Sequence, residues 1–154
     1  MKIYFSYDKK EREGYERKDP ANYDVWAYGH DNVEEFVGEN ILEKLPNLIV
    51  FIECCYSLLK PGATATFTSP YYNSYQAWCD PRNIRGISQG SLNFADKKWR
   101  EDNGCPDLCT ADFEIGVNYS IDVLTNQRAE DAKAFWLSRY SNVIQSIMFT
   151  LKKR

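Results

Sequence analysis

Two patterns of hydrophobic and polar positions alternate along the chain, one typical of short strands and one typical of helices. Segments rich in β-branched and aromatic residues are bounded by glycine, proline or asparagine, which predicts strands. The predicted strands are 2–7, 23–28, 33–37, 63–69, 112–123 and 143–151. Segments 91–102 and 129–140 are predicted to be helices, with Phe94 and Trp99 of the first packing inward.

The clearest helix is predicted over residues 46–59. One apolar face recurs at helical spacing: Leu48, Ile52, Cys55 and Leu59. Pro46 suits the first helical turn, because the N–H that proline lacks has no partner there. The turn Lys60-Pro61-Gly62 ends the helix, and segment 63–69 follows as a small, β-branched, buried strand. Helix, turn and interior strand in this order predict an αβ unit of a parallel sheet.

Composition limits the classes of protein that the chain can belong to. Its 154 residues suit one domain spanning 1–154, and its 44% hydrophobic and 15% aromatic residues supply a core, which excludes a disordered chain. The net charge is −3 and no basic face is visible, so nucleic acid is not expected as a partner. No apolar run approaches the roughly 18 residues of a membrane span. Charge comes too early for a signal peptide, so the expected location is the cytoplasm.

The five cysteines predict free thiols rather than a disulfide framework, because their number is odd and no secretion signal precedes them. Cys105 and Cys109 have the spacing of half a zinc site. A zinc site needs four ligands, and the single histidine, His30, lies far away in the sequence. No metal is therefore expected. His30 itself is either a general base or a solvated loop residue.

An ordered series of motifs resembles the class I S-adenosylmethionine-dependent methyltransferases. The run Leu58-Leu59-Lys60-Pro61-Gly62, a strand and then Ser69-Pro70 resembles a helix ending "LKPGG" that leads into a strand ending in proline. Residues 33–46 resemble the family's "VDEIYASHVLEHLP" segment, and residues 80–85 resemble the "DPTHVR" element of one branch. The resemblance, which covers chiefly residues 33–154, implies an α/β fold with a Rossmann-like, mostly parallel sheet, flanking helices and an antiparallel C-terminal strand.

The resemblance also implies a cofactor site, and this sequence departs from the family there. The resemblance implies that five residues would contact S-adenosylmethionine: Tyr7, Asp8, Asp19, Glu39 and Asn40. Asp19 ends a segment that resembles the second strand, where an acidic residue binds ribose hydroxyls. The family's glycine-rich turn after the first strand is replaced by Tyr4-Phe5-Ser6-Tyr7-Asp8, and no glycine occurs before Gly14. Aromatic side chains at this turn fill the space of methionine and ribose, so we expect weak cofactor binding or none.

The segment after strand 63–69 is a candidate binding site for a small-molecule substrate, because ligands of open α/β sheets bind at the carboxyl ends of strands. Its candidate residues are Tyr71, Tyr72, Tyr75, Trp78, Asp80 and Arg85. The rings suit stacking on a flat or sugar-like ligand, with Asp80 and Arg85 giving polar contacts. The alternative is that the rings cap a small core and that Asp80 and Arg85 form a structural ion pair.

Three functional classes follow from these observations. The first is an active methyltransferase acting on a small molecule. The second is a catalytically inactive homologue that serves as a binding module or a homo-oligomer partner. The third is a different enzyme that uses the same crevice. Methyl transfer depends mainly on positioning, so the lack of a legible catalytic triad does not choose among them.

Overall fold

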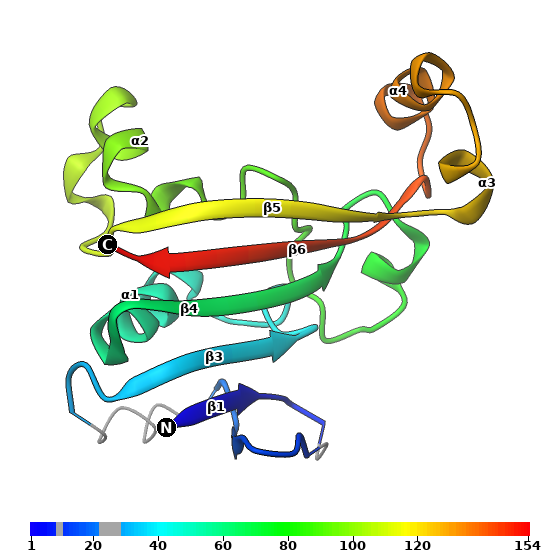
Figure 1. The fold of residues 1–154 in the computed structure, drawn as a ribbon. Coiled ribbons are helices and arrows are strands. Elements are labelled where there is room, and N and C mark those ends of the chain that lie inside the picture. The colour runs from blue at the N-terminus through cyan, green and yellow to red at the C-terminus, as the bar shows by residue number, and fades with distance from the viewer. Residues whose placement is uncertain (9–10, 22–28) are drawn as a thin grey trace.

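Six strands form one mixed sheet in the order β2-β1-β3-β4-β6-β5 (Figure 1). The strands are β1 (Lys2–Phe5), β2 (Glu16–Lys18), β3 (Val33–Glu39), β4 (Leu59–Pro70), β5 (Phe113–Ile121) and β6 (Ile144–Lys153). β1, β2, β3 and β4 run parallel to one another, whereas β6 is antiparallel to both of its neighbours, β4 and β5. This computed structural model describes residues 1–8, 11–21 and 29–154, so the predicted strand 23–28 lies outside the described residues. The predicted α/β class and antiparallel C-terminal strand are confirmed.

The helix between β3 and β4 is α1 (Leu48–Leu58), which starts two residues later than the sequence pattern predicts. Pro46 precedes the helix, and Asn47 is the N-cap because its side chain accepts a hydrogen bond from the Val50 amide. Leu59 has extended backbone angles and already belongs to β4. The Lys-Pro-Gly turn is therefore part of the long strand.

The predicted helix 91–102 is broken in two. A 3₁₀ turn, η3 (Asn93–Ala95), is followed by Asp96, whose extended backbone and side chain cap the short helix α2 (Lys97–Asp102). Phe94 and Trp99, expected to pack inward, are only half-buried, whereas Arg100 is the buried residue of α2. The remaining helices are α3 (Val123–Asn126) and α4 (Glu130–Arg139), which form an arm at one end of the sheet (Figure 1).

Four phenylalanines build the core between the sheet and α1. The rings of Phe5 and Phe36, from adjacent strands, stack at 5.1 Å, and the ring of Phe51 from α1 meets Phe5 at 5.1 Å and Phe67 of β4 at 5.6 Å. All four side chains are fully buried. These contacts fix α1 across β1, β3 and β4, as the apolar face of the predicted helix requires.

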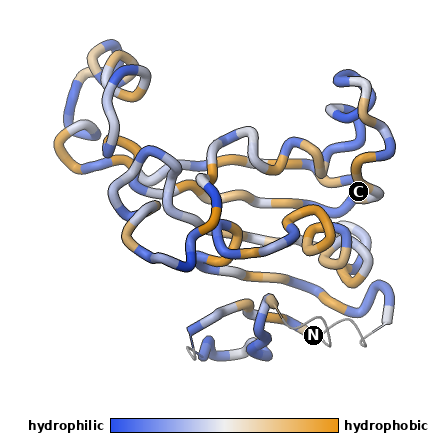
Figure 2. Tube along the Cα trace, turned by 180° about the vertical axis from the view of Figure 1, so that it is seen from behind, coloured by the Kyte–Doolittle hydropathy of each residue, from blue (hydrophilic) through white to orange (hydrophobic). Residues whose placement is uncertain are grey.

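The two faces of the sheet differ in polarity. In β4 the residues Ala65, Phe67 and Ser69 are buried, whereas the threonines between them are half-exposed on the opposite face. β6 alternates in the same way, with Ile147, Phe149 and Leu151 buried. Figure 2, which views the molecule from behind, shows α1 and the long loops across the apolar face, and the described helices leave the front face of Figure 1 open. The interior position predicted for strand 63–69 is confirmed, but only every second residue of it is buried.

Candidate ligand site at the carboxyl ends of the strands

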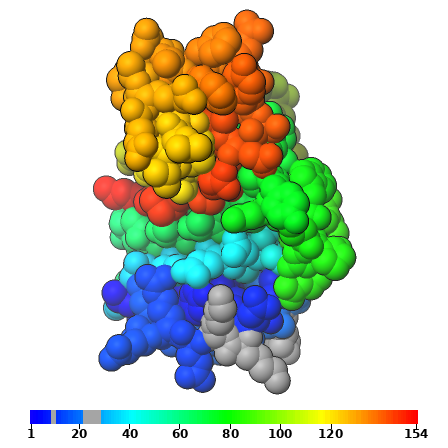
Figure 3. Space-filling model, turned by 90° about the vertical axis from the view of Figure 1, so that its right-hand side faces the viewer, coloured from blue at the N-terminus to red at the C-terminus, as the bar shows by residue number. Residues whose placement is uncertain are grey.

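The carboxyl ends of β1, β3 and β4 lie at one edge of the sheet because these strands are parallel. Three loops follow them: 6–8, 40–47 and 71–90. Figure 3 views this edge and shows the third loop bulging beside the strand ends, below the arm formed by α3 and α4. Most of the residues predicted to bind cofactor or substrate belong to these loops.

Local hydrogen bonds hold the turn after β1. The buried Ser6 donates its amide to the Lys18 carbonyl (3.1 Å) and its hydroxyl to the Asp8 carbonyl (2.6 Å), while Arg17 donates to the Ser6 carbonyl (3.3 Å). None of the residues in this turn has a positive φ. A glycine-rich turn would instead offer backbone groups to a ligand. Here the Ser6 amide, the Ser6 carbonyl and the Asp8 carbonyl are bound to protein partners.

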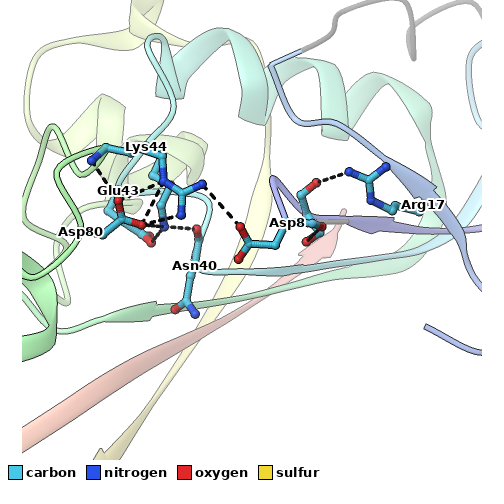
Figure 4. Close-up of polar contacts among 8 residues, drawn as sticks. Asp8, Arg17, Asn40, Glu43, Lys44 and Asp80 are labelled. Carbon is cyan, nitrogen blue, oxygen red and sulfur yellow. Dashed lines mark hydrogen bonds and ion pairs between the residues drawn. The ribbon is translucent and has the colours of Figure 1, made fainter. Parts of the chain in front are cut away.

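A chain of charged side chains crosses the strand ends, and we call it the charge network (Figure 4). Arg82 is bonded to both carboxylate oxygens of Asp80, at 2.7 to 3.1 Å, and reaches Asp8 at 3.4 Å. Lys44 lies 3.6 Å from Asp80 and 2.9 Å from Glu43. The network thus joins the loop after β1 to the loops after β3 and β4.

Within this network, Asp80 and Arg82 shift each other's pKa. Hydrogen bonds from Arg82 hold the pKa of Asp80 well below its usual range, and the same carboxylate raises the pKa of Arg82. The structural alternative from the sequence paired Asp80 with Arg85, and this pairing is wrong. Arg85 instead donates to the Pro46 carbonyl at 3.3 Å. Arg82 is the partner of Asp80 because its guanidinium, two residues along the chain, can bind both carboxylate oxygens of Asp80.

The other predicted cofactor residues are dispersed. Asn40 has a left-handed backbone conformation (φ 53°). Its backbone amide donates a hydrogen bond to the Thr68 carbonyl, and its backbone carbonyl accepts one from the Lys44 ammonium at 2.7 Å. Glu39 contacts Tyr4 and Arg12 of the N-terminal segment instead. Asp19 is exposed and accepts a bond from the amide of Ala21 at 2.9 Å. Only Asp8 and Asn40 therefore lie in the region of the charge network, and Tyr7 beside them is half-buried.

Sequence reasoning missed Glu43, the most deeply buried acidic residue at this edge. Its exposed fraction is 2%, its Oε1 contacts Lys44, and its Oε2 has no hydrogen-bond partner. Its carbonyl accepts the amides of Ile84 (2.9 Å) and Arg85 (3.3 Å), which anchors the loop after β4 to the loop after β3. The only sequence signal was a charged pair placed between two leucines that prove to be buried.

Two of the predicted aromatic residues line a cavity. Tyr72 and Trp78 border a space of about 380 Å³ together with Gly86, Ser88 and Gln89. We call this space the aromatic cavity. Tyr71 is buried, lines a neighbouring cavity and donates a hydrogen bond from its hydroxyl to the Gln89 side chain at 2.7 Å.

Tyr75 behaves differently from the other predicted rings. It is 76% exposed and does not line the aromatic cavity, although it lies in the same loop, in the 3₁₀ turn η2 (Tyr75–Trp78). Of the predicted substrate residues, Asp80 belongs to the charge network, and Tyr72 and Trp78 line the aromatic cavity. Tyr71, Tyr75 and Arg85 belong to neither.

His30 and the cysteines lie apart from this edge. His30 Nδ1 is 2.7 Å from the Ser57 hydroxyl, and both residues line a cavity of about 410 Å³ with Glu53 and Cys54. All five cysteines are thiols, as predicted. Within residues 1–8, 11–21 and 29–154, no three potential ligands are grouped to hold a metal ion. The same residues include no helix long and apolar enough to cross a membrane.

Comparison with solved structures places this fold among class I methyltransferases. An S-adenosylmethionine-dependent methyltransferase from Archaeoglobus fulgidus superposes with a TM-score of 0.62 at 16% identity, covering 91% of this chain and 68% of that one. A similar enzyme from Thermotoga maritima gives 0.51 at 11% identity, covering 91% and 63%. Phosphoethanolamine N-methyltransferase 2 from Haemonchus contortus, solved with S-adenosylhomocysteine, gives 0.50 at 10% identity, covering 80% and 34%.

These similarities concern the fold. No protein-family model matches the sequence, and no curated protein matches it. At identities of 10 to 16%, the shared architecture carries no residue-by-residue assignment of activity. The fold expected from the sequence motifs is therefore confirmed, and the site must be judged from its own geometry.

Proposed function

We propose that this chain is a catalytically inactive methyltransferase-like domain that binds a small ligand and does not transfer methyl groups. The observation that supports this most directly is the charge network, which joins Asp8 to Lys44 through Arg82 and Asp80. In this fold the cofactor belongs at the same edge, where the parallel strands end.

The residues present do not fit S-adenosylmethionine. The cofactor brings an ammonium, a carboxylate and a sulfonium to the turn after the first strand, and it needs free backbone groups there. In this turn Ser6 has committed both its amide and its carbonyl to protein partners. Asp8 and Asp80, two acidic groups at this edge, are already paired with Arg82. Binding would require these exposed pairs to rearrange, and their loss would offset part of the gain from new contacts.

An active small-molecule methyltransferase is the second candidate. The fold favours it, and so does Asp19, which follows β2 where an acidic residue would bind ribose hydroxyls. A single carboxylate at the correct strand end does not replace a complete binding turn, so we rank this candidate lower.

Calorimetric titration of S-adenosylmethionine and S-adenosylhomocysteine into the purified chain separates the two candidates. We expect no saturable binding below about 1 mM, which corresponds to a binding free energy weaker than about −4 kcal/mol. The matched variant Arg82→Gln removes the central cation of the network and leaves a shorter, neutral polar side chain. Stoichiometric binding to the unmodified chain at micromolar affinity would contradict the proposal and favour the active enzyme.

A further inference from the structure

We propose that the aromatic cavity binds a neutral, hydroxyl-bearing ring, namely a hexose unit of an oligosaccharide. This inference rests on the part of the proposed function that assigns ligand binding to the chain. It does not depend on whether the cofactor binds, because the cavity and the charge network share no residue.

The absence of charge from the lining is the first argument. The cavity is bordered by Tyr72, Trp78, Gly86, Ser88 and Gln89. A neighbouring cavity of about 310 Å³ shares Gln89 with it and is lined by Tyr71, Tyr119, Ala134, Leu137, Ser138 and Ile144. Every one of these residues is neutral, although 27% of the chain is charged. A charged ligand would lose water here without gaining an ionic partner, so the lining favours a neutral one.

A fixed but exposed aromatic platform is the second argument. Trp78 is 65% exposed and Tyr72 is 45% exposed. Trp78 is nevertheless held in place, because its Nε1 donates to the Tyr72 carbonyl at 2.9 Å. Rings that are ordered before a ligand arrives lose little conformational entropy on binding, and they offer a large apolar area to it.

Gly86 permits this arrangement. A Cβ atom at position 86 would lie 2.9 Å from the Tyr72 Cβ and 3.7 Å from Trp78 Cζ2. The first distance is shorter than real Cβ atoms tolerate, so any larger residue would push Tyr72 away. The chain thus places its smallest residue where a side chain would collide with Tyr72.

Neutral hydrogen-bonding groups beside the rings are the third argument. The Tyr71 hydroxyl donates to Gln89 Oε1 at 2.7 Å, which orients the Gln89 amide so that its Nε2 group is a donor for a ligand. Ser88 adds a hydroxyl that lies 3.4 Å from the Ser91 hydroxyl. A hexose has one face of C–H groups and a rim of hydroxyls. Rings that cover the face, with amide and hydroxyl groups for the rim, match both features.

Titration with three neutral oligosaccharides tests this inference: maltotriose, cellotriose and tri-N-acetylchitotriose. Binding is followed by saturation-transfer NMR, which reports which sugar protons touch the protein. We expect at least one of the three to bind with a dissociation constant of about 0.1 to 1 mM. Trp78→Ala should weaken that binding at least tenfold, with C–H protons of one sugar face giving the largest signals.

Tyr75→Ala is the matched control, because Tyr75 lies in the same loop, is more exposed than Trp78 and does not line the cavity. It should leave the dissociation constant within twofold of the unmodified chain. Failure of all three sugars to bind would overturn the inference, as would equal effects of the two substitutions. Tighter binding of a uronic-acid trisaccharide or of a neutral planar aromatic would also overturn it, since either would identify a different ligand class. Cofactor binding in calorimetry would refute the proposed inactivity and leave this sugar test unaffected.

Discussion

Gly38→Ala should destabilise the fold, because the end of β3 has no space for a methyl group. A Cβ at this position would lie 2.6 Å from Ile41 Cδ1 and 2.9 Å from Phe67 Cδ1. Both neighbours are fully buried, so neither can move into solvent. Overpacking of this kind costs about 1–3 kcal/mol in the free energy of unfolding.

Gly116→Ala supplies the control within the same sheet. The added Cβ would meet only ordinary contacts there, at 3.7 Å from the Thr150 Cβ and carbonyl oxygen. Replacing a glycine that accepts a side chain without strain stabilises a protein by about 0.4–1 kcal/mol, because the unfolded chain loses freedom. The two substitutions share this unfolded-state effect, so the difference between them measures the crowding around Gly38.

Thermal and urea unfolding of both variants provide the measurement. A loss of about 2 kcal/mol at Gly38 should lower the melting temperature by about 4–8 °C. Ile41→Val removes the nearest clashing carbon at a cost of about 0.5–1.5 kcal/mol on its own. The loss of unfolding free energy in the double variant should therefore be about 1 kcal/mol smaller than the sum of the losses in the two single variants. Equal melting temperatures for the Gly38 and Gly116 variants would refute the reasoning.

Two further predictions concern charged groups. Arg100 is 3% exposed, and its Nη1 donates hydrogen bonds to the carbonyls of Phe94 (2.6 Å) and Ala111 (2.8 Å). Arg100→Ala should therefore lower the free energy of unfolding, measured in urea, by about 2–5 kcal/mol, and Arg100→Lys should lower it less. Hydrogen bonds from Arg82 lower the pKa of Asp80. The Asp80 carboxylate therefore stabilises the fold fully at pH values above the usual carboxyl pKa, and this stabilisation is lost as the pH falls from there through the lowered pKa. Asp80→Asn should therefore lose less stability than the unmodified chain between pH 5 and pH 2, and parallel acid unfolding curves for the two proteins would contradict this.

Local sequence pattern was sufficient for the αβ unit at the centre of the fold. The helical spacing of apolar residues in segment 46–59 located α1, and the small, β-branched composition of segment 63–69 located β4. Both signals are local properties that the sequence displays directly. The prediction was wrong where a single side chain overrides the pattern, as at Asp96, which caps a new helix inside the segment predicted as one.

The tertiary structure decided which polar groups meet at the strand ends. Asp8 and Arg82 are 74 residues apart and become neighbours only because β1, β3 and β4 end at the same edge of the sheet. The sequence identified Asp80 as a polar candidate, yet its choice of Arg82 over Arg85 depends on the path of one loop. Glu43 was missed because burial of a charged side chain depends on what packs over it, and no local periodicity records that.

The sequence by itself determined the order and type of most elements, because hydrophobic periodicity is a local property of the chain. The tertiary structure alone decided that α1 and the long loops cover one face of the sheet and that Trp78 and Tyr72 line a cavity while Tyr75 does not. Aromatic residues in a loop look alike in a sequence. Their exposure depends on contacts such as the bond from Trp78 Nε1 to the Tyr72 carbonyl and the space left by Gly86, which arise only when distant parts of the loop pack together.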